Sequence, residues 1–141
     1  MFANILLLVS TLLWGVWGYT NKLAVDHAHP LTVQWMYSIP IALMIPIYYW
    51  LGATQAPATN LNGDALKYAL ISGVMSGVAV MLYFFAVRST SASIATAITA
   101  AYPIVTLLLA ILFRTEDFSL RKLIGIIVVI AGVILLQSEG A

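Results

Sequence analysis

Long apolar runs separated by short polar links dominate the chain. Transmembrane β-strands are only about half the length of a transmembrane helix and alternate in polarity, whereas these runs are long and continuously apolar. The pattern therefore predicts an all-α integral membrane protein with five transmembrane helices, and the short links place neighbouring spans antiparallel. The predicted spans cover residues 4–25, 31–51, 65–87, 91–113 and 120–137.

Composition supports the same class. Of 141 residues, 62% are hydrophobic and 8% are charged, against about 25% charged in an average soluble domain. The absence of cysteine excludes disulfides and thiolate metal sites, and the net charge of +1 without a basic cluster gives no basis for nucleic-acid binding. The first apolar run follows no Lys or Arg and precedes no small-x-small cleavage site. We therefore expect a retained first span in one multi-pass domain, residues 1–141, of the plasma or inner membrane.

The run from 91 to 113 differs between its two halves. Its first half consists mainly of small or hydroxylated residues such as Ser93, Thr96 and Thr99, and its second half is strongly apolar. Small residues on a membrane helix let another helix or a solute approach the backbone. Pro103 cannot donate to the Thr99 carbonyl, which breaks the helical hydrogen-bond pattern inside the membrane. This span is expected to form the inner wall of a cavity.

The first span combines aromatic, amide and basic side chains. Trp14, Gly18 and Asn21 share one helical face, with Trp17 and Lys22 beside it. One interpretation is packing, with Lys22 extending to the membrane interface. The alternative is a cavity wall whose cation meets an anionic group.

The second and third spans add further polar positions. Pro40 and Pro46 predict a bend in the second span. Gln34 and Ser38, one helical turn apart, either face a pocket or bond a neighbouring helix. The third span carries a mixed stripe at helical spacing, formed by Ser72, Met75, Ser76, Ala79 and Tyr83.

Charged residues gather in the links. Asp26, His27 and His29 are interpreted as solvated turn residues and not as metal ligands, so no metal or cofactor is expected. The residues around the start of the last span are interpreted as interface anchors and caps; they are Glu116, Asp117, Arg121 and Lys122.

The segment from 86 to 136 resembles the EamA-type repeat of the drug/metabolite transporter superfamily. The matching features are the small-residue span with Pro103, the following Glu116, and the two glycines of the last span, Gly125 and Gly132. The pair Trp14-Gly15 followed by Lys22 resembles the first span of the same repeat. Two positions depart from the family pattern: Tyr37 stands where an arginine is common, and Thr115 where a glycine is usual.

The resemblance implies half of an inverted-repeat transporter. Members of that superfamily usually carry two such repeats in opposite orientations, with a solute path between them. One repeat recovers that geometry as an antiparallel homodimer or with another half-protein. The charge bias is weak, which permits insertion in both orientations: Lys67, Arg114, Arg121 and Lys122 lie on the N-terminal side, and Lys22 and Arg88 on the other.

The predicted function is transport of small metabolites, such as amino-acid-like or other amphipathic solutes, across the lipid bilayer. The alternative is a non-transporting assembly subunit that binds a partner protein through its glycine strips, which are Gly73 and Gly77 in the third span and Gly125 and Gly132 in the last. An enzyme is not expected, because no nucleophile with a base or acid/base pair lies within the spans. The predicted substrate pathway comprises Trp14, Trp17, Asn21, Lys22, Gln34, Ser72, Ser76, Tyr83, Thr96, Thr99, Tyr102 and Pro103.

Overall fold

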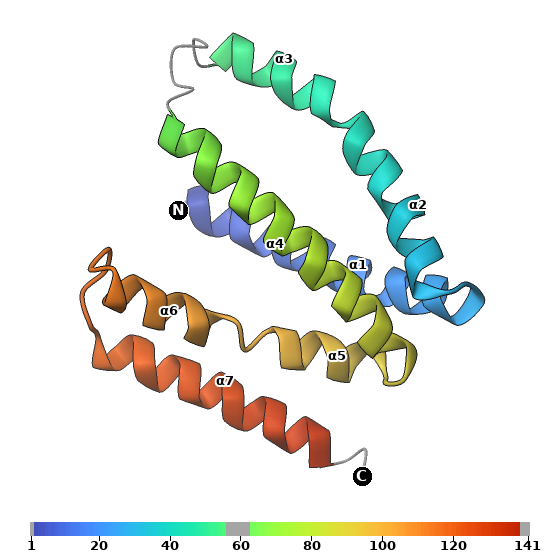
Figure 1. Ribbon diagram of the computed structural model, residues 1–141. Helices are drawn as coiled ribbons and strands as arrows, with labels where there is room; N and C mark the ends of the chain where they lie inside the picture. Colours follow the sequence, from blue (N-terminus) through green and yellow to red (C-terminus); the bar gives the residue numbers. More distant parts are fainter. Residues whose placement is uncertain (1, 56–62, 139–141) are drawn as a thin grey trace. The chain divides into compact units, whose positions relative to one another are not determined.

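Helices joined by short links make up the part of the chain that this computed structural model describes, residues 2–55 and 63–138, and no strand occurs there (Figure 1). This confirms the all-α prediction. The helices are α1 (Phe2–His27), α2 (Pro30–Leu43), α3 (Ile45–Gln55), α4 (Gly63–Arg88), α5 (Ala92–Thr99), α6 (Pro103–Leu112) and α7 (Leu120–Ser138).

The helices lie close to the predicted spans: the first three extend a few residues beyond them, the fifth extends by one residue, and the fourth is one residue shorter at each end. Four stretches are long and apolar enough to cross a membrane: Phe2–His27, Pro30–Gln55, Gly63–Arg88 and Ala92–Leu112. The fifth predicted span is α7, an apolar helix of 19 residues. The second link was predicted too long, because α3 continues to Gln55 and α4 already begins at Gly63; the rest of that link, 56–62, lies outside the described residues.

Contacts divide the chain into two compact units. Unit 1 contains Met1–Thr20 and Thr90–Ala141, and unit 2 contains Asn21–Ser89. The helix α1 contributes to both, since it runs without a break from Phe2 to His27. In unit 1, α5 packs against α7, and in unit 2, α2 packs against α4.

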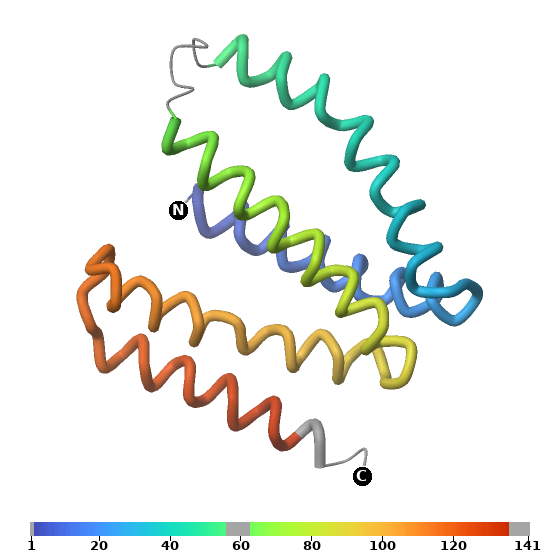
Figure 2. Tube along the Cα trace, in the orientation of Figure 1, coloured from blue at the N-terminus to red at the C-terminus, as the bar shows by residue number. Residues whose placement is uncertain are grey.

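The predicted bend in the second span is confirmed. Helix α2 ends at Leu43 and α3 begins at Ile45, so Met44 separates two straight segments (Figure 2). The Met44 N–H still donates to the carbonyls of Pro40 and Ile41, at 3.2 and 3.1 Å. Pro40 stays inside α2, which places the interruption between the two prolines.

The predicted break at Pro103 is also confirmed, but a different carbonyl is affected. Helix α5 ends at Thr99 and α6 starts at Pro103. The Thr99 carbonyl accepts from the Tyr102 N–H at 3.1 Å, so a tighter turn replaces the bond that proline cannot make. The Ile104 N–H donates to Ala101 at 3.1 Å instead of to Ala100, the residue four before it. The break therefore displaces the Ala100 carbonyl from the helical pattern.

Candidate functional site

The buried side chains of unit 2 gather where three helix ends meet. We call this region the packed end: the end of α1 from Asn21, the start of α2 to Tyr37, and the end of α4 from Tyr83. The Lys22 Nζ reaches the Arg88 carbonyl at 3.5 Å, which links α1 to α4. Its buried residues are Asn21, Val25, Pro30, Val33, Tyr83, Phe84 and Val87.

Two amide groups stand out in this apolar region. Asn21 is only 6% exposed, and its Nδ2 has no hydrogen-bond partner in the described structure. The Oε1 of Gln34 is likewise buried and unpaired. A buried polar group left unpaired costs about 1–3 kcal/mol. The packed end thus holds one free donor and one free acceptor, both at positions predicted to line the substrate pathway.

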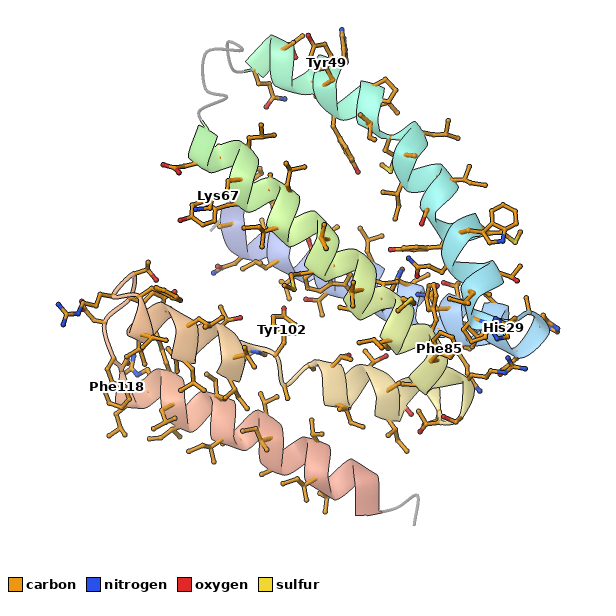
Figure 3. All side chains as sticks on the ribbon, viewed as in Figure 1. His29, Tyr49, Lys67, Phe85, Tyr102 and Phe118 are labelled. Carbon is orange, nitrogen blue, oxygen red and sulfur yellow. The ribbon has the colours of Figure 1, made fainter. Side chains whose placement is uncertain are left out.

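Aromatic rings surround these helix ends. The rings of Tyr37 and Phe84 meet edge to face with centroids 5.6 Å apart, and Tyr83 lies 6.3 Å from Phe84. His29 makes a similar edge contact with Phe85 at 5.8 Å (Figure 3). Such contacts contribute about 0.5–1.5 kcal/mol each beyond area burial. The Tyr37–Phe84 and His29–Phe85 contacts therefore hold the start of α2 against α4, whereas Tyr83–Phe84 lies within α4.

The charge of Lys22 is balanced within the same region. Its Nζ lies 2.8 Å from the Asp26 Oδ1, one turn further along α1. His29 acts as a helix cap, because its Nδ1 accepts from the Leu31 N–H at 3.3 Å. Asp26 and His29 therefore have local partners, and no group of three or more potential metal ligands forms among residues 2–55 and 63–138.

The hydroxyl-rich half of the fourth span borders a hollow inside unit 1. Its volume is about 500 Å³. Thr96 donates its hydroxyl to the Ala92 carbonyl at 2.7 Å, and Thr99 donates to Ala95 at 3.1 Å. The Thr96 oxygen keeps a lone pair that can accept from a solute in the hollow, whereas Thr99 does not line it. The hollow is lined by Gly15, Tyr19, Ala92, Ser93, Thr96, Ala97 and Ala100.

A second cavity in unit 1 lies beside the proline break. It measures about 390 Å³ and we call it the α5–α7 pocket. Sequence analysis placed Tyr102 and Pro103 on a cavity wall, and both line this pocket; Tyr102 lies in the break itself (Figure 3). The complete lining is Ala100, Ala101, Tyr102, Pro103, Thr106, Leu107, Glu116, Arg121, Lys122, Gly125, Ile126 and Val129.

Sequence analysis missed the α7 side of this pocket. It interpreted the charged residues as interface anchors and caps, and it named Gly125 as a matching feature of the family resemblance. The available signal was the spacing of Arg121, Gly125 and Val129, which recur every four residues and so share one helical face. On that face the cationic side chain of Arg121 is followed by Gly125, which has no side chain, and then by the apolar Val129.

The remaining predicted residues lie outside these clusters. Ser72 and Ser76 are exposed on the first part of α4, residues 63–79, none of which is buried. Trp14 is exposed and Trp17 half-buried on α1. Of the residues in unit 2, the structure groups Asn21, Lys22, Gln34 and Tyr83 at the packed end but leaves the two serines apart from it.

Comparisons with known proteins identify related chains. The model of the EamA-like transporter family matches residues 1–138. An uncharacterized protein of Methanocaldococcus jannaschii is 30% identical over 135 residues, covering 96% of each chain. Uncharacterized transporters from two strains of Helicobacter pylori are 25% and 24% identical over 97% of this chain but only 45% of their own length. The chain thus spans about half the length of these two transporters, and no solved structure gives a significant match.

Proposed function

Because the chain belongs to the EamA-like transporter family, we propose that it carries small amphipathic or zwitterionic metabolites across the plasma or inner membrane. The observation that supports this solute class most directly is the unpaired donor of Asn21 and the unpaired acceptor of Gln34. A solute with both hydrogen-bonding characters satisfies both groups, and the half-buried ring of Tyr37 at the same packed end offers an aromatic surface to its apolar part.

The proposed working form is a pair of such units in opposite orientations. The Helicobacter transporters contain about twice the matched length, while the Methanocaldococcus protein is matched over almost its whole length. An inverted pair places a central site where it opens alternately to the two faces of the membrane. The first part of α4 and all of α3 have no buried residue and are available to a second copy or another half-protein.

Transport by purified protein in liposomes tests the solute class. A panel of radiolabelled amino acids and nucleosides is offered to wild type, Asn21→Leu and Gln34→Leu. We expect at least one solute to enter above empty vesicles, and each variant to reduce that flux about tenfold or more. Each variant should keep its stability, because it removes an unsatisfied buried group.

Thr11→Val is the matched control, since Thr11 is exposed and its hydroxyl bonds only the Leu7 carbonyl of its own helix. If Thr11→Val transports at the wild-type rate, the reduced flux of the other two variants is due to the loss of the Asn21 and Gln34 amides. No flux of any solute by the wild type, or full flux in both amide variants, contradicts the proposal.

Labelling from either side of the membrane tests the orientation. The chain has no cysteine, so Thr54→Cys at the end of α3 provides a single thiol. In intact cells, an impermeant maleimide should label one fraction from outside, and the rest should react only after the cells are opened. Labelling of all molecules from one side rules out insertion in both orientations.

The alternative function is a non-transporting subunit that binds a partner protein. It is favoured by the glycines of α4, because a Cβ at Gly73 or Gly77 would meet nothing within 4 Å. Nothing near them in the described chain therefore requires their small size. Purification of a defined heterocomplex that encloses no polar cavity supports this function, whereas a two-fold homodimer enclosing one supports transport.

A further inference from the structure

The α5–α7 pocket has two chemically different ends. Its long wall is apolar and comes from Leu107 and the proline break on one side and from Ile126 and Val129 on the other. Its remaining end is formed by Glu116 from the preceding link and by Arg121 and Lys122 at the start of α7. The pocket lies entirely within unit 1.

The polar end carries an uncompensated positive charge. Arg121 and Lys122 lie in the first turn of α7, which contains no acidic residue. Lys122 pairs with Glu116, and the only other ion pair among the described residues joins Lys22 to Asp26, so Arg121 has none. The partial positive charge of a helix N-terminus adds to that of Arg121. This arrangement attracts an anion even though Glu116 lies nearby, because Lys122 neutralises its carboxylate.

The volume of the pocket and its position at the start of α7 indicate which kind of anion it can bind. Its 390 Å³ is roughly the volume of one turn of a helix 10 Å wide, which is too little for a helix of a second copy. An acyl chain is far thinner and fits an apolar groove of this size. Arg121 also stands at the start of α7, the apolar helix predicted as the fifth span, and the end of a span lies at the depth of phospholipid headgroups.

We propose that the α5–α7 pocket binds an anionic phospholipid. The phosphate lies against Arg121 and the first turn of α7, and one acyl chain follows the wall past Gly125 toward Val129. Gly125 makes room for that chain, because a Cβ there would meet nothing within 4 Å. This inference does not depend on which solute, if any, the protein transports.

Native mass spectrometry of the detergent-solubilised full chain tests the headgroup. The protein is mixed with equal amounts of phosphatidylglycerol and phosphatidylcholine with the same acyl chains. We expect phosphatidylglycerol to bind preferentially, and Arg121→Gln to reduce its affinity about fivefold, the effect of about 1 kcal/mol per basic residue near anionic lipid. Lys67→Gln is the charge-matched control, because Lys67 does not line the pocket. Equal binding of the two lipids, or equal effects of the two variants, overturns the proposal.

A second pair of variants tests the acyl-chain groove. Gly125→Leu places a side chain in the pocket and should reduce the number of bound phosphatidylglycerol molecules. Gly132→Leu is the control on the same helix, since its Cβ also meets nothing within 4 Å but Gly132 does not line the pocket. Circular dichroism and monodisperse elution establish that both variants fold.

Three outcomes overturn the proposal. The first is equal lipid binding by the two leucine variants. The second, from a separate competition experiment, is displacement of phosphatidylglycerol by excess inorganic phosphate, which would show that the headgroup binds without help from the groove. The third is a dimer that buries the pocket and excludes all lipid.

Discussion

The two parts of α4 show opposite environments along one continuous helix. At its end, Tyr83, Phe84 and Val87 are buried, and the Tyr37 ring of α2 meets Phe84 edge to face. From 63 to 79 no residue of the same helix is buried. Both parts are strongly apolar, so hydrophobicity alone does not explain the difference. Within unit 2, the residues of α4 that are buried are those whose side chains pack against side chains of the neighbouring helices.

This difference indicates where other molecules are needed. Lipid covers apolar residues such as Val74 as well as protein does, because there is no hydrophobic drive between helices inside a bilayer. Serines gain nothing from lipid, and Ser72 and Ser76 lie on the exposed part. The exposed part of α4 is therefore the part that we expect to meet a second unit or a solute.

The largest expected effect is at the packed end. Phe84→Ala empties a site that is 0% exposed and should lower the free energy of unfolding in mixed micelles by about 2 kcal/mol. This is less than the 3–5 kcal/mol of water-soluble cores, because separated helices still bury phenylalanine in the micelle. Val74→Ala on the same helix, where Val74 is 65% exposed, should change it by less than about 0.5 kcal/mol. Equal losses in the two variants would contradict the contrast between the two parts of α4.

A smaller effect on stability, but a clear one on transport, is expected from substitution of Ser76 in the polar stripe of α4 that also contains Ser72. Ser76→Val should alter the unfolding free energy by less than about 0.5 kcal/mol, since Ser76 is exposed. If the stripe faces the solute path of a paired form, liposome flux falls several-fold, and Thr20→Val, which removes an exposed hydroxyl bonded to its own helix, leaves it unchanged. Full flux in Ser76→Val removes that residue from the pathway.

The smallest effect is expected for the ion pair at the packed end. Asp26→Asn removes the partner of Lys22, but the two side chains are 43% and 26% exposed and lie one turn apart on the same helix. Such pairs contribute about 0.3–0.5 kcal/mol, and salt screens them. Unfolding at low and high ionic strength should show this small loss at low salt only. A loss as large as that of Phe84→Ala would contradict the assignment of this ion pair as a weak, partly exposed one.

Much of the secondary structure was predictable from local chemistry. Apolar runs of membrane-spanning length predicted the helices, and proline predicted both the bend near Met44 and the break before Pro103. The details of hydrogen bonding were less predictable. The Thr99 carbonyl recovers a donor from Tyr102, so the break affects Ala100 instead, and only the actual backbone path decides which carbonyl loses its partner.

The candidate sites were only partly predictable. Asn21, Gln34 and Tyr83 were identified from residue type and helical position, but burial without a partner is a property of packing. The α5–α7 pocket was missed on its α7 side because Arg121 and Gly125 matched common patterns of anchoring and helix contact.

The sequence by itself determined that this is a helical, multi-pass membrane protein, because span length, polarity and proline act locally along the chain. Its membership of the EamA-like transporter family was also readable from the sequence, through the resemblance to that family and not through span length or polarity. Only the tertiary structure decided which of its similar apolar surfaces interlock at the packed end and which stay open. It also decided that a cation and a glycine of α7 meet the proline break around one pocket. Many helix faces of this chain are equally apolar, so the shapes of the side chains and the positions of a few polar atoms decide which faces come into contact. Hydrophobicity along the sequence reports neither of these.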